Sequence, residues 1–138
     1  MKIYFAASIR GGRQDANLYL QLIEHLKNFG EVLTEHIGDA SLNSFGEDGI
    51  TDEYIHDRDM NWLLSADVVV AEVTTASLGV GYEIGRAIEN DKKVICLFRK
   101  QEGKRVSAMI AGSKDVISEE YMDLESAKKI INSYLRHS

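Results

Sequence analysis

The sequence predicts an α/β protein whose doubly wound sheet, Rossmann-like or flavodoxin-like, has about five parallel strands flanked by helices. Two observations predict this fold. Short apolar segments alternate with segments of helical periodicity along the 138 residues, as in proteins built from βαβ units. The run from Asp67 to Val73 is almost continuously apolar and rich in valine, which suits a strand covered on both faces. We therefore treat residues 1–138 as a single domain.

The first half of the chain predicts two strands and two helices. In order, they are the strand Lys2–Ala7, the helix Asp15–Phe29, the strand Glu31–Ile37, the loop Gly38–Thr51 and a helix from Thr51 or Asp52 to Ser65. The first helix carries apolar residues at i, i+4 and i+8, and we expect Gly30 to be its C-cap. The second begins at a residue suited to N-capping. The loop is polar and long, and long loops in compact domains are often functional.

The second half continues the same alternation. In order, we expect the central strand Asp67–Val73, a glycine-rich turn and helix to about Asn90, the strand Lys93–Phe98, a short helical segment within Gly103–Ala111, a weaker strand Lys114–Ser118 and a terminal helix Asp123–Arg136. In such sheets, ligands bind outside the carboxyl ends of the strands. The turns after the first and central strands are the richest in glycine and serine, so we expect them to meet around one crevice.

The composition excludes several classes of function. A net charge of −6 provides no basic field for nucleic acid or an anionic membrane. The one cysteine, Cys96, lies in a buried-strand pattern, so we expect an inert core thiol, no disulfide within the chain and no zinc site built from thiolates. We find neither a signal-peptide pattern nor an apolar run of the ~18 residues that a membrane span needs. We expect a cytoplasmic protein.

The glycine-rich turn has two alternative readings. Gly79, Gly81 and Gly85 form G-x-G-x-x-x-G, one residue longer than the dinucleotide fingerprint, and no ribose-binding acid follows at the usual distance. We therefore do not expect NAD or FAD. In the alternative reading, the glycines only allow the helix to pack closely on its strand. The chain also lacks the P-loop motif of nucleoside triphosphatases.

The crevice is predicted to bind a phosphate monoester. The segment from Ser8 to Arg13 offers backbone N–H groups, a hydroxyl and two guanidinium groups, and Ser77 and Gly79 offer donors across the cleft. A solvated surface turn is the alternative reading of the first loop.

Two carboxylates are placed to act on a substrate in that crevice. Glu83 lies in the central helix, and Asp59 lies on the preceding helix with His56 and Trp62 three residues to either side. Paired carboxylates, one ionised and one protonated, cleave glycosidic bonds. Alternatively, Asp59 is on a solvated helix face, or it binds a metal with His36 and His56. Because no H-E-x-x-H motif or close ligand spacing is present, we expect no metal.

These residues resemble the opening and core of the 2′-deoxynucleoside 5′-phosphate N-hydrolases, within the nucleoside 2-deoxyribosyltransferase superfamily. The resemblance covers roughly residues 3–113. The segments that carry it are Tyr4–Arg13, Val32–His36, Ile55-His56 with Asp59, Trp62-Leu63, Ala66–Thr74, Ser77–Arg86, Cys96–Arg99 and Val106–Ile110. It implies a Rossmann-like homodimer, without a cofactor, that hydrolyses a deoxynucleoside 5′-monophosphate to a free base and 2-deoxyribose 5-phosphate.

The resemblance also implies a role for individual residues. Glu83 matches the nucleophile that forms a covalent glycosyl intermediate, Asp59 the acid that assists base departure, and Tyr4 a tyrosine that orients the nucleophile. Ser107 matches a serine that completes the phosphate site of the partner subunit. The implied substrate contacts are Ala7, Ser8, Ile9, Arg10, Gly11, Gly12, Arg13, His36, Ser77, Gly79, Ser107, Ala108 and Met109.

The helix dipole predicts that Glu83 stays ionised, and apolar cover from Trp62 predicts that Asp59 becomes a neutral acid. Three other functions stay open: a nucleoside 2-deoxyribosyltransferase, a non-catalytic nucleotide sensor and a receiver domain. A receiver needs an acidic pair after the first strand, where this chain has Ala6-Ala7-Ser8. The loop at 38–51 differs from the mammalian members of the family, so the preferred base also stays open.

Overall fold

The computed structural model describes residues 1–9, 13–36 and 50–135. Five strands form one parallel sheet in the order β2-β1-β3-β4-β5, with helices on both faces. The elements are β1 (Lys2–Ala7), α1 (Arg13–Leu26), β2 (Glu31–Leu33), α3 (Asp52–Ser65), β3 (Val68–Glu72), α4 (Leu78–Glu89), β4 (Lys93–Arg99), α5 (Ala108–Ala111), β5 (Val116–Tyr121) and α6 (Leu124–Leu135). The predicted doubly wound fold is confirmed.

The strand order creates one switch point. From β1 the chain goes outward to β2 and then returns to the other side of β1 as β3, where Ala7 lies opposite Glu72. The connections from β1 and β3 therefore leave in opposite directions, which opens a crevice at the carboxyl ends of these two strands. Both segments predicted to bind substrate, after Ala7 and after Glu72, begin here.

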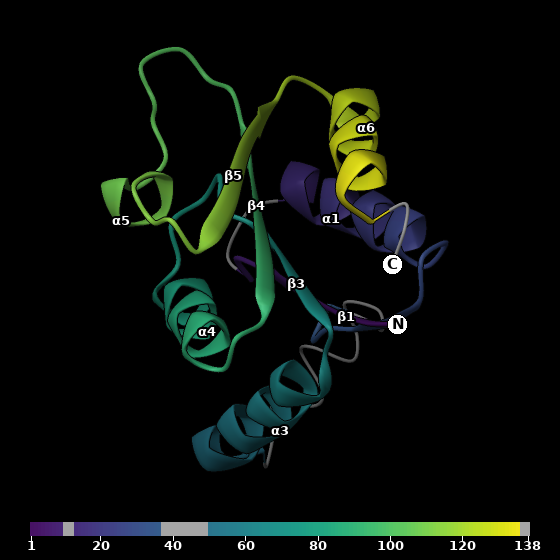
Figure 1. The fold of residues 1–138 in the computed structure, drawn as a ribbon, viewed down its shortest axis with the longest axis vertical. Coiled ribbons are helices and arrows are strands. Elements are labelled where there is room, and N and C mark those ends of the chain that lie inside the picture. Colours follow the sequence, from purple (N-terminus) through teal and green to yellow (C-terminus); the bar gives the residue numbers. More distant parts are fainter. Residues whose placement is uncertain (10–12, 37–49, 136–138) are drawn as a thin grey trace.

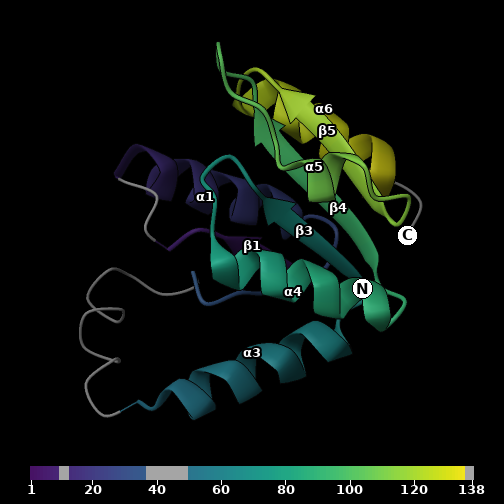
Figure 2. The ribbon, with the colours of Figure 1, turned by 90° about the vertical axis from the view of Figure 1, so that its left-hand side faces the viewer.

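Alternate residues of each strand face two separate cores. In β1, Phe5 packs with α1 and α6, whereas Tyr4 packs with α3 and α4. Figures 1 and 2 show α1 and α6 covering one face of the sheet and α3 and α4 the other. All five residues of β3 are buried, which explains its continuous apolar pattern. Burying a large aliphatic side chain contributes about 1.5–3 kcal/mol, so the two-sided cover makes β3 a rigid centre for the site.

Several predicted boundaries were wrong. The strand β2 ends at Leu33, not Ile37, because the chain turns there and the Thr34 hydroxyl accepts the His36 N–H at 3.1 Å. Within Gly103–Ala111, only the last four residues are helical, after Gly103 with its φ of 76°. The strand β5 extends to Tyr121, which pairs with Arg99 of β4.

Other boundaries shift by a few residues. The helix α1 begins at Arg13 and ends at Leu26. Gly30 does not have the positive φ that favours glycine at a helix C-cap. Glycine is required there for a different reason: the Cβ of any other residue would lie 2.1 Å from the Met1 carbonyl oxygen. Most of the predicted loop, residues 38–49, lies outside the described residues.

Two predictions from composition can be compared with the structure. Cys96 is fully buried in β4, and burial raises the pKa of its thiol to about 12. Among the described helices, none is long and apolar enough to cross a membrane.

Candidate active site

Glu83 is held inside the site by β1. The chain leaves β3, turns, and enters α4, where the Ser77 hydroxyl caps the helix by accepting the Val80 N–H at 3.2 Å. Glu83 lies in the second turn of α4 and is only 7% exposed. Because β1 is next to β3, the Tyr4 hydroxyl on the same face reaches Glu83 and donates a hydrogen bond to its Oε2. This contact fixes the carboxyl group at the crevice.

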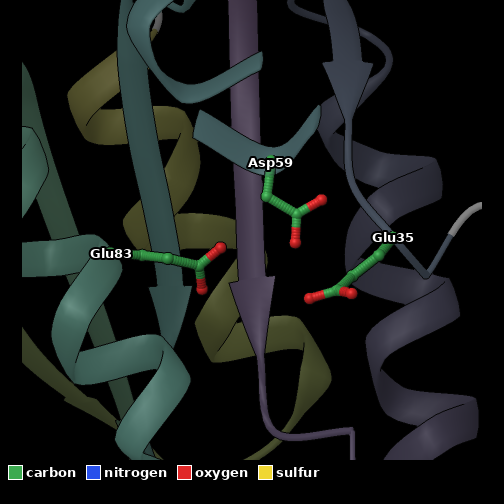
Figure 3. Close-up of side chains that lie close together, drawn as sticks. All are labelled: Glu35, Asp59 and Glu83. Carbon is green, nitrogen blue, oxygen red and sulfur yellow. The ribbon is translucent and has the colours of Figure 1, made fainter. Parts of the chain in front are cut away.

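Two further carboxyl groups face Glu83. Asp59 comes from α3 and is 6% exposed, and Glu35 comes from the turn after β2. One oxygen from each of the three carboxyl groups lies within 4.8 Å of the others. Figure 3 shows the three groups pointing toward one another beside β1. Three separate segments therefore build one acid cluster, formed by Glu35, Asp59 and Glu83.

Arg58 is the cation that contacts this acid cluster in the described part of the chain. Its Nε donates to Asp59 Oδ1 at 3.0 Å, and its Nη2 lies 3.6 Å from Glu35 Oε2. Trp62 stacks on the Arg58 guanidinium, 4.8 Å from its ring centroid. Trp62, which was expected to cover Asp59, thus covers the neighbouring residue Arg58.

Burial raises the pKa of Glu83 to about 7; the Tyr4 hydrogen bond opposes the rise, and the Asp59 charge adds to it. Burial likewise raises the pKa of Glu35 to about 7, with the charges of Asp59 and Glu83 and a hydrogen bond to Asp59 adding to it. The expectation that the helix dipole keeps Glu83 ionised was therefore wrong, because the effect of burial on the pKa is larger. The dipole acts mainly within the first turn, and Glu83 lies beyond it. The site retains protons near neutral pH.

The acid cluster has enough oxygen atoms for a divalent cation, but its contacts fit another use. Arg58 already binds an Asp59 oxygen, and the Tyr4 hydroxyl binds Glu83. A cation bound at these same two oxygen atoms would compete with both donors. The predicted metal partners of Asp59 are also placed elsewhere: His36 bonds a backbone carbonyl and His56 bonds Tyr82. The arrangement suits proton transfer and nucleophilic attack.

A cleft of about 490 Å³ opens over two members of the acid cluster, Glu35 and Glu83. As predicted, the turns after β1 and β3 meet around it. Its lining comprises Ala7, Ser8, Ile9, Glu35, the segment 75–80 and Glu83. Ser8 is 4% exposed. Of the other predicted contacts in the first loop, Arg10, Gly11 and Gly12 lie outside the described residues, as does the side chain of Arg13.

His36 does not line this cleft. Its Nε2 donates to the Ala7 carbonyl oxygen at 3.1 Å, and its ring packs against Phe5 and Tyr19. Burial lowers the pKa of His36. The neutral ring therefore anchors the end of β1.

Ser107 lies beside a second cleft, of about 480 Å³, together with Met109. The segment 75–78 and Val80 line both clefts, so this ridge separates Ser107 from Glu83 within one chain. Ala108 lines neither of the two. Ser107 caps α5 by accepting the Met109 N–H at 3.2 Å. The three residues predicted to bind substrate from this segment are therefore not brought into the Glu83 cleft by their own chain.

The face of α4 beside the second cleft is open. A Cβ at Gly81 or Gly85 would contact nothing within 4 Å, so these glycines do not serve close packing of the helix on its own strand. Leu78 is 96% exposed and Met109 is 82% exposed. Small and apolar residues thus lie together on a surface that the described residues of this chain leave uncovered.

Sequence reasoning missed Glu35 and Arg58 as site residues. Glu35 lies inside the segment Val32–His36, which the predicted strand Glu31–Ile37 already accounted for. Arg58 lies within the charged run His56-Asp57-Arg58-Asp59, a pattern that is also typical of a solvated helix face. Its spacing of four residues from both Tyr54 and Trp62 was the available signal, because such residues share a helix face.

Comparison with known proteins shows close relatives over most of the chain. The nucleoside 2-deoxyribosyltransferase family model matches residues 3–132. A Nematostella vectensis protein is 54% identical over 96% of this chain and 93% of its own. The 5-hydroxymethyl-dUMP N-hydrolase of Tetraodon nigroviridis is 57% identical, over 82% of this chain and 80% of its own. The human protein of the same name is 54% identical, over 82% of this chain and 66% of its own. The likeness thus extends beyond the expected limit at residue 113.

Two solved structures share the fold. The CMP N-glycosidase BcmB of Clostridium botulinum aligns with a TM-score of 0.71 at 19% identity, over 98% of this chain and 100% of its own. A 2-deoxyribosyltransferase from Bacillus psychrosaccharolyticus aligns with a TM-score of 0.65 at 16% identity, over 93% of this chain and 90% of its own. At these identities the likeness concerns the fold.

Proposed function

The chain belongs to the nucleoside 2-deoxyribosyltransferase family, and from this premise we propose that it hydrolyses the N-glycosidic bond of 2′-deoxynucleoside 5′-monophosphates. The products are a free base and 2-deoxyribose 5-phosphate. One observation carries the proposal: Glu83, held by Tyr4, lines a cleft together with Ser8 and Ser77, and it also faces Asp59. Relatives more than half identical carry the name of nucleotide N-hydrolases.

The reaction proceeds in two displacements. The Glu83 carboxylate attacks C1′, and the electron pair of the C1′–N bond moves to the base, which takes a proton from Asp59. Water then attacks C1′, its proton passes to the Asp59 carboxylate, and Glu83 leaves as a carboxylate. Oxygens of Asp59 and Glu83 lie within 4.8 Å of each other, which favours a covalent intermediate, since direct attack by water needs carboxyl groups about 6.5–9.5 Å apart. Tyr4 orients the nucleophile.

The substrate phosphate is bound by the segment Ser8–Arg13 and by Ser77. Charge-assisted hydrogen bonds to an anion contribute about 1.5–3 kcal/mol each. Gly79 leaves the approach to the cleft open, and Ala7 and Ile9 flank it.

The active form is a homodimer, in which Ser107 completes the phosphate site of the partner. The separation of Ser107 from the Glu83 cleft within one chain supports this assembly, as does the uncovered α4 face with Leu78 and Met109. Ala108 and Met109 approach the neighbouring site with Ser107. The enzyme requires no cofactor and acts in the cytoplasm.

A 2-deoxyribosyltransferase is the second candidate, favoured by the family model and by the fold shared with such an enzyme. It uses the same nucleophile but passes the sugar to another base. The two functions are distinguished by incubating the protein with each deoxynucleotide, with and without an acceptor base. We expect free base and 2-deoxyribose 5-phosphate in both cases. Formation of a new nucleotide at the expense of hydrolysis would support the transferase.

The covalent step is tested by acid quench during turnover and intact-mass measurement. We expect a deoxyribosyl-phosphate adduct in wild-type protein and none in Glu83→Gln. Ribonucleotides should react poorly, because the 2′-hydroxyl destabilises the cationic transition state. Comparable hydrolysis of GMP and dGMP would contradict the proposed substrate class.

A further inference from the structure

Arg58 is held in place by its own helix. Tyr54 and Trp62 lie four residues before and after it on α3, and the guanidinium carbon is 6.0 Å and 4.8 Å from their ring centroids. Residues at this spacing share one helix face, and a guanidinium over an aromatic ring gains a cation–π interaction. These rings leave the guanidinium in contact with the acid cluster.

Arg58 contacts two carboxyl groups that come from different parts of the chain. Its Nε bonds Asp59 at 3.0 Å, and its Nη2 lies 3.6 Å from Glu35. The third carboxyl group, Glu83, has its own donor in Tyr4. The acid cluster is thus divided into a nucleophile held by a neutral hydroxyl and a pair, Glu35 and Asp59, held by a cation.

We propose that Arg58 is a positioning residue that makes Glu35 and Asp59 act as one proton-sharing pair, so that either carboxyl group supplies the proton that the departing base takes. This inference rests on the proposed function. As the C1′–N bond breaks, its electron pair moves to the base, and the base receives a proton from Asp59. Where the proton rests on Glu35, its O–H bond breaks and Asp59 is reprotonated from it. The base leaves neutral.

Arg58 matters more after the proton transfer than before it. Before the transfer, the pair holds one proton and carries one negative charge. Afterwards it carries two, while Glu83 has become a neutral ester, so the total charge of the site is unchanged. The guanidinium offsets one of the two charges. An interaction that strengthens along the reaction accelerates it, whereas one that is equal in both states does not. Loss of Arg58 should therefore slow only reactions in which the pair gives up its proton.

The test compares two substrates, one whose base must be protonated as it leaves and one whose base needs no proton. dGMP requires protonation of its base, whereas 7-methyl-dGMP already carries the positive charge and releases a neutral base. For Arg58→Gln we expect kcat/KM to fall about 10²-fold for dGMP, the lower range of general acid catalysis, and by less than a tenth of that factor for 7-methyl-dGMP. For pyrimidines, dUMP and 5-fluoro-dUMP form the matched pair, because 5-fluorouracil is the better leaving group.

Four further variants complete the experiment. Arg58→Lys keeps the charge without the planar fork, and we expect a partial recovery for dGMP. Glu35→Gln should give the same substrate dependence, and the double variant should be less impaired than the product of the two single effects. Arg86→Gln is the matched control, because Arg86 also lies over an aromatic ring, that of Tyr82, and donates to its hydroxyl. It should leave both rates as in the wild type.

An equal loss for both substrates in folded Arg58→Gln would reduce Arg58 to a structural role and overturn the inference. Wild-type rates in that variant would overturn it as well. If the wild type hydrolyses no deoxynucleotide, the proposed function itself fails. That result differs from an active enzyme in which the Arg58 variants show no substrate dependence.

Discussion

Glu83 is buried, and its pKa is raised to about 7. Burial is the larger cause, and the single hydroxyl of Tyr4 only partly offsets it. A carboxylate with few donors is a better nucleophile than one surrounded by N–H groups, because less solvation is lost on attack. The cost of that arrangement falls on the stability of the fold.

At the scale of the residue, Glu83→Gln should separate activity from folding. The amide is nearly isosteric but not nucleophilic, so we expect kcat to fall by several orders of magnitude. Circular dichroism and thermal unfolding should show an intact fold. A folded Gln variant that keeps substantial base release would contradict the role of Glu83 as nucleophile.

The same substitution should change the pH dependence of stability. Glu83 and Glu35 have a raised pKa of about 7 in the folded protein, against an ordinary value of 4.5. Between these two values the folded state binds more protons than the unfolded state, so the free energy of unfolding falls as pH rises. At pH 8 the free energy of unfolding of Glu83→Gln should therefore exceed that of the wild type by an amount on the order of 1–3 kcal/mol, and the variant should unfold at a higher temperature. At pH 4 the difference should largely vanish, and a larger gain at pH 4 would contradict the raised pKa.

At the scale of the element, the turn between β3 and α4 is built by side chains that bind backbone. Glu72, buried at the end of β3, accepts the Thr74 N–H at 2.9 Å and the hydroxyls of Thr74 and Tyr121. Ser77 then caps α4. The ridge between the two clefts is therefore held from both ends, which keeps its donors in place for an anion.

Ser77 caps α4 and is proposed to bind the phosphate, and two substitutions that both preserve the N-cap can separate these roles. Asp and Asn both serve well as N-caps, so Ser77→Asp and Ser77→Asn should unfold like the wild type. Only Asp repels a phosphate. We expect Ser77→Asp to lower kcat/KM for dGMP about tenfold to a hundredfold while that for deoxyguanosine stays near the wild-type value. The preference for the monophosphate should survive better in Ser77→Asn. Equal rates of the wild type on dGMP and deoxyguanosine would contradict the phosphate site.

At the scale of the whole molecule, the arrangement of clefts predicts that a complete site needs two chains. Ser107 and Glu83 lie on opposite sides of the ridge at 75–80. In a two-fold dimer, each site can take one residue from each chain, and the same surface serves both partners.

Mixed dimers provide the decisive measurement. Glu83→Ala removes the nucleophile and Ser107→Asp repels the phosphate, so each homodimer is inactive. Refolding the two together should produce about half mixed dimers, each with one intact site, and about a quarter of all sites should recover activity. Each variant refolded alone is the control. Mixed dimers without activity would show that Ser107 does not act in the neighbouring site.

The amino-acid sequence by itself determined the fold class, the strand Lys2–Ala7, the positions of the central strand and of the strand that begins at Lys93, and the crevice after β1 and β3. Burial and backbone geometry leave periodic patterns that are local, so a parallel sheet covered on both faces is visible in the valines of β3. The carboxylates Asp59 and Glu83 were also predicted, since each follows from the motif around it.

Only the tertiary structure decided which groups surround those carboxylates. Glu35 enters the acid cluster because β2 stops at Leu33 and the chain turns toward β1, and Arg58 reaches it because Trp62 and Tyr54 direct its side chain. The structure likewise separated Ser107 from Glu83. These outcomes depend on contacts between segments distant in the chain. A pKa set by burial among three such segments has no local pattern from which to be read.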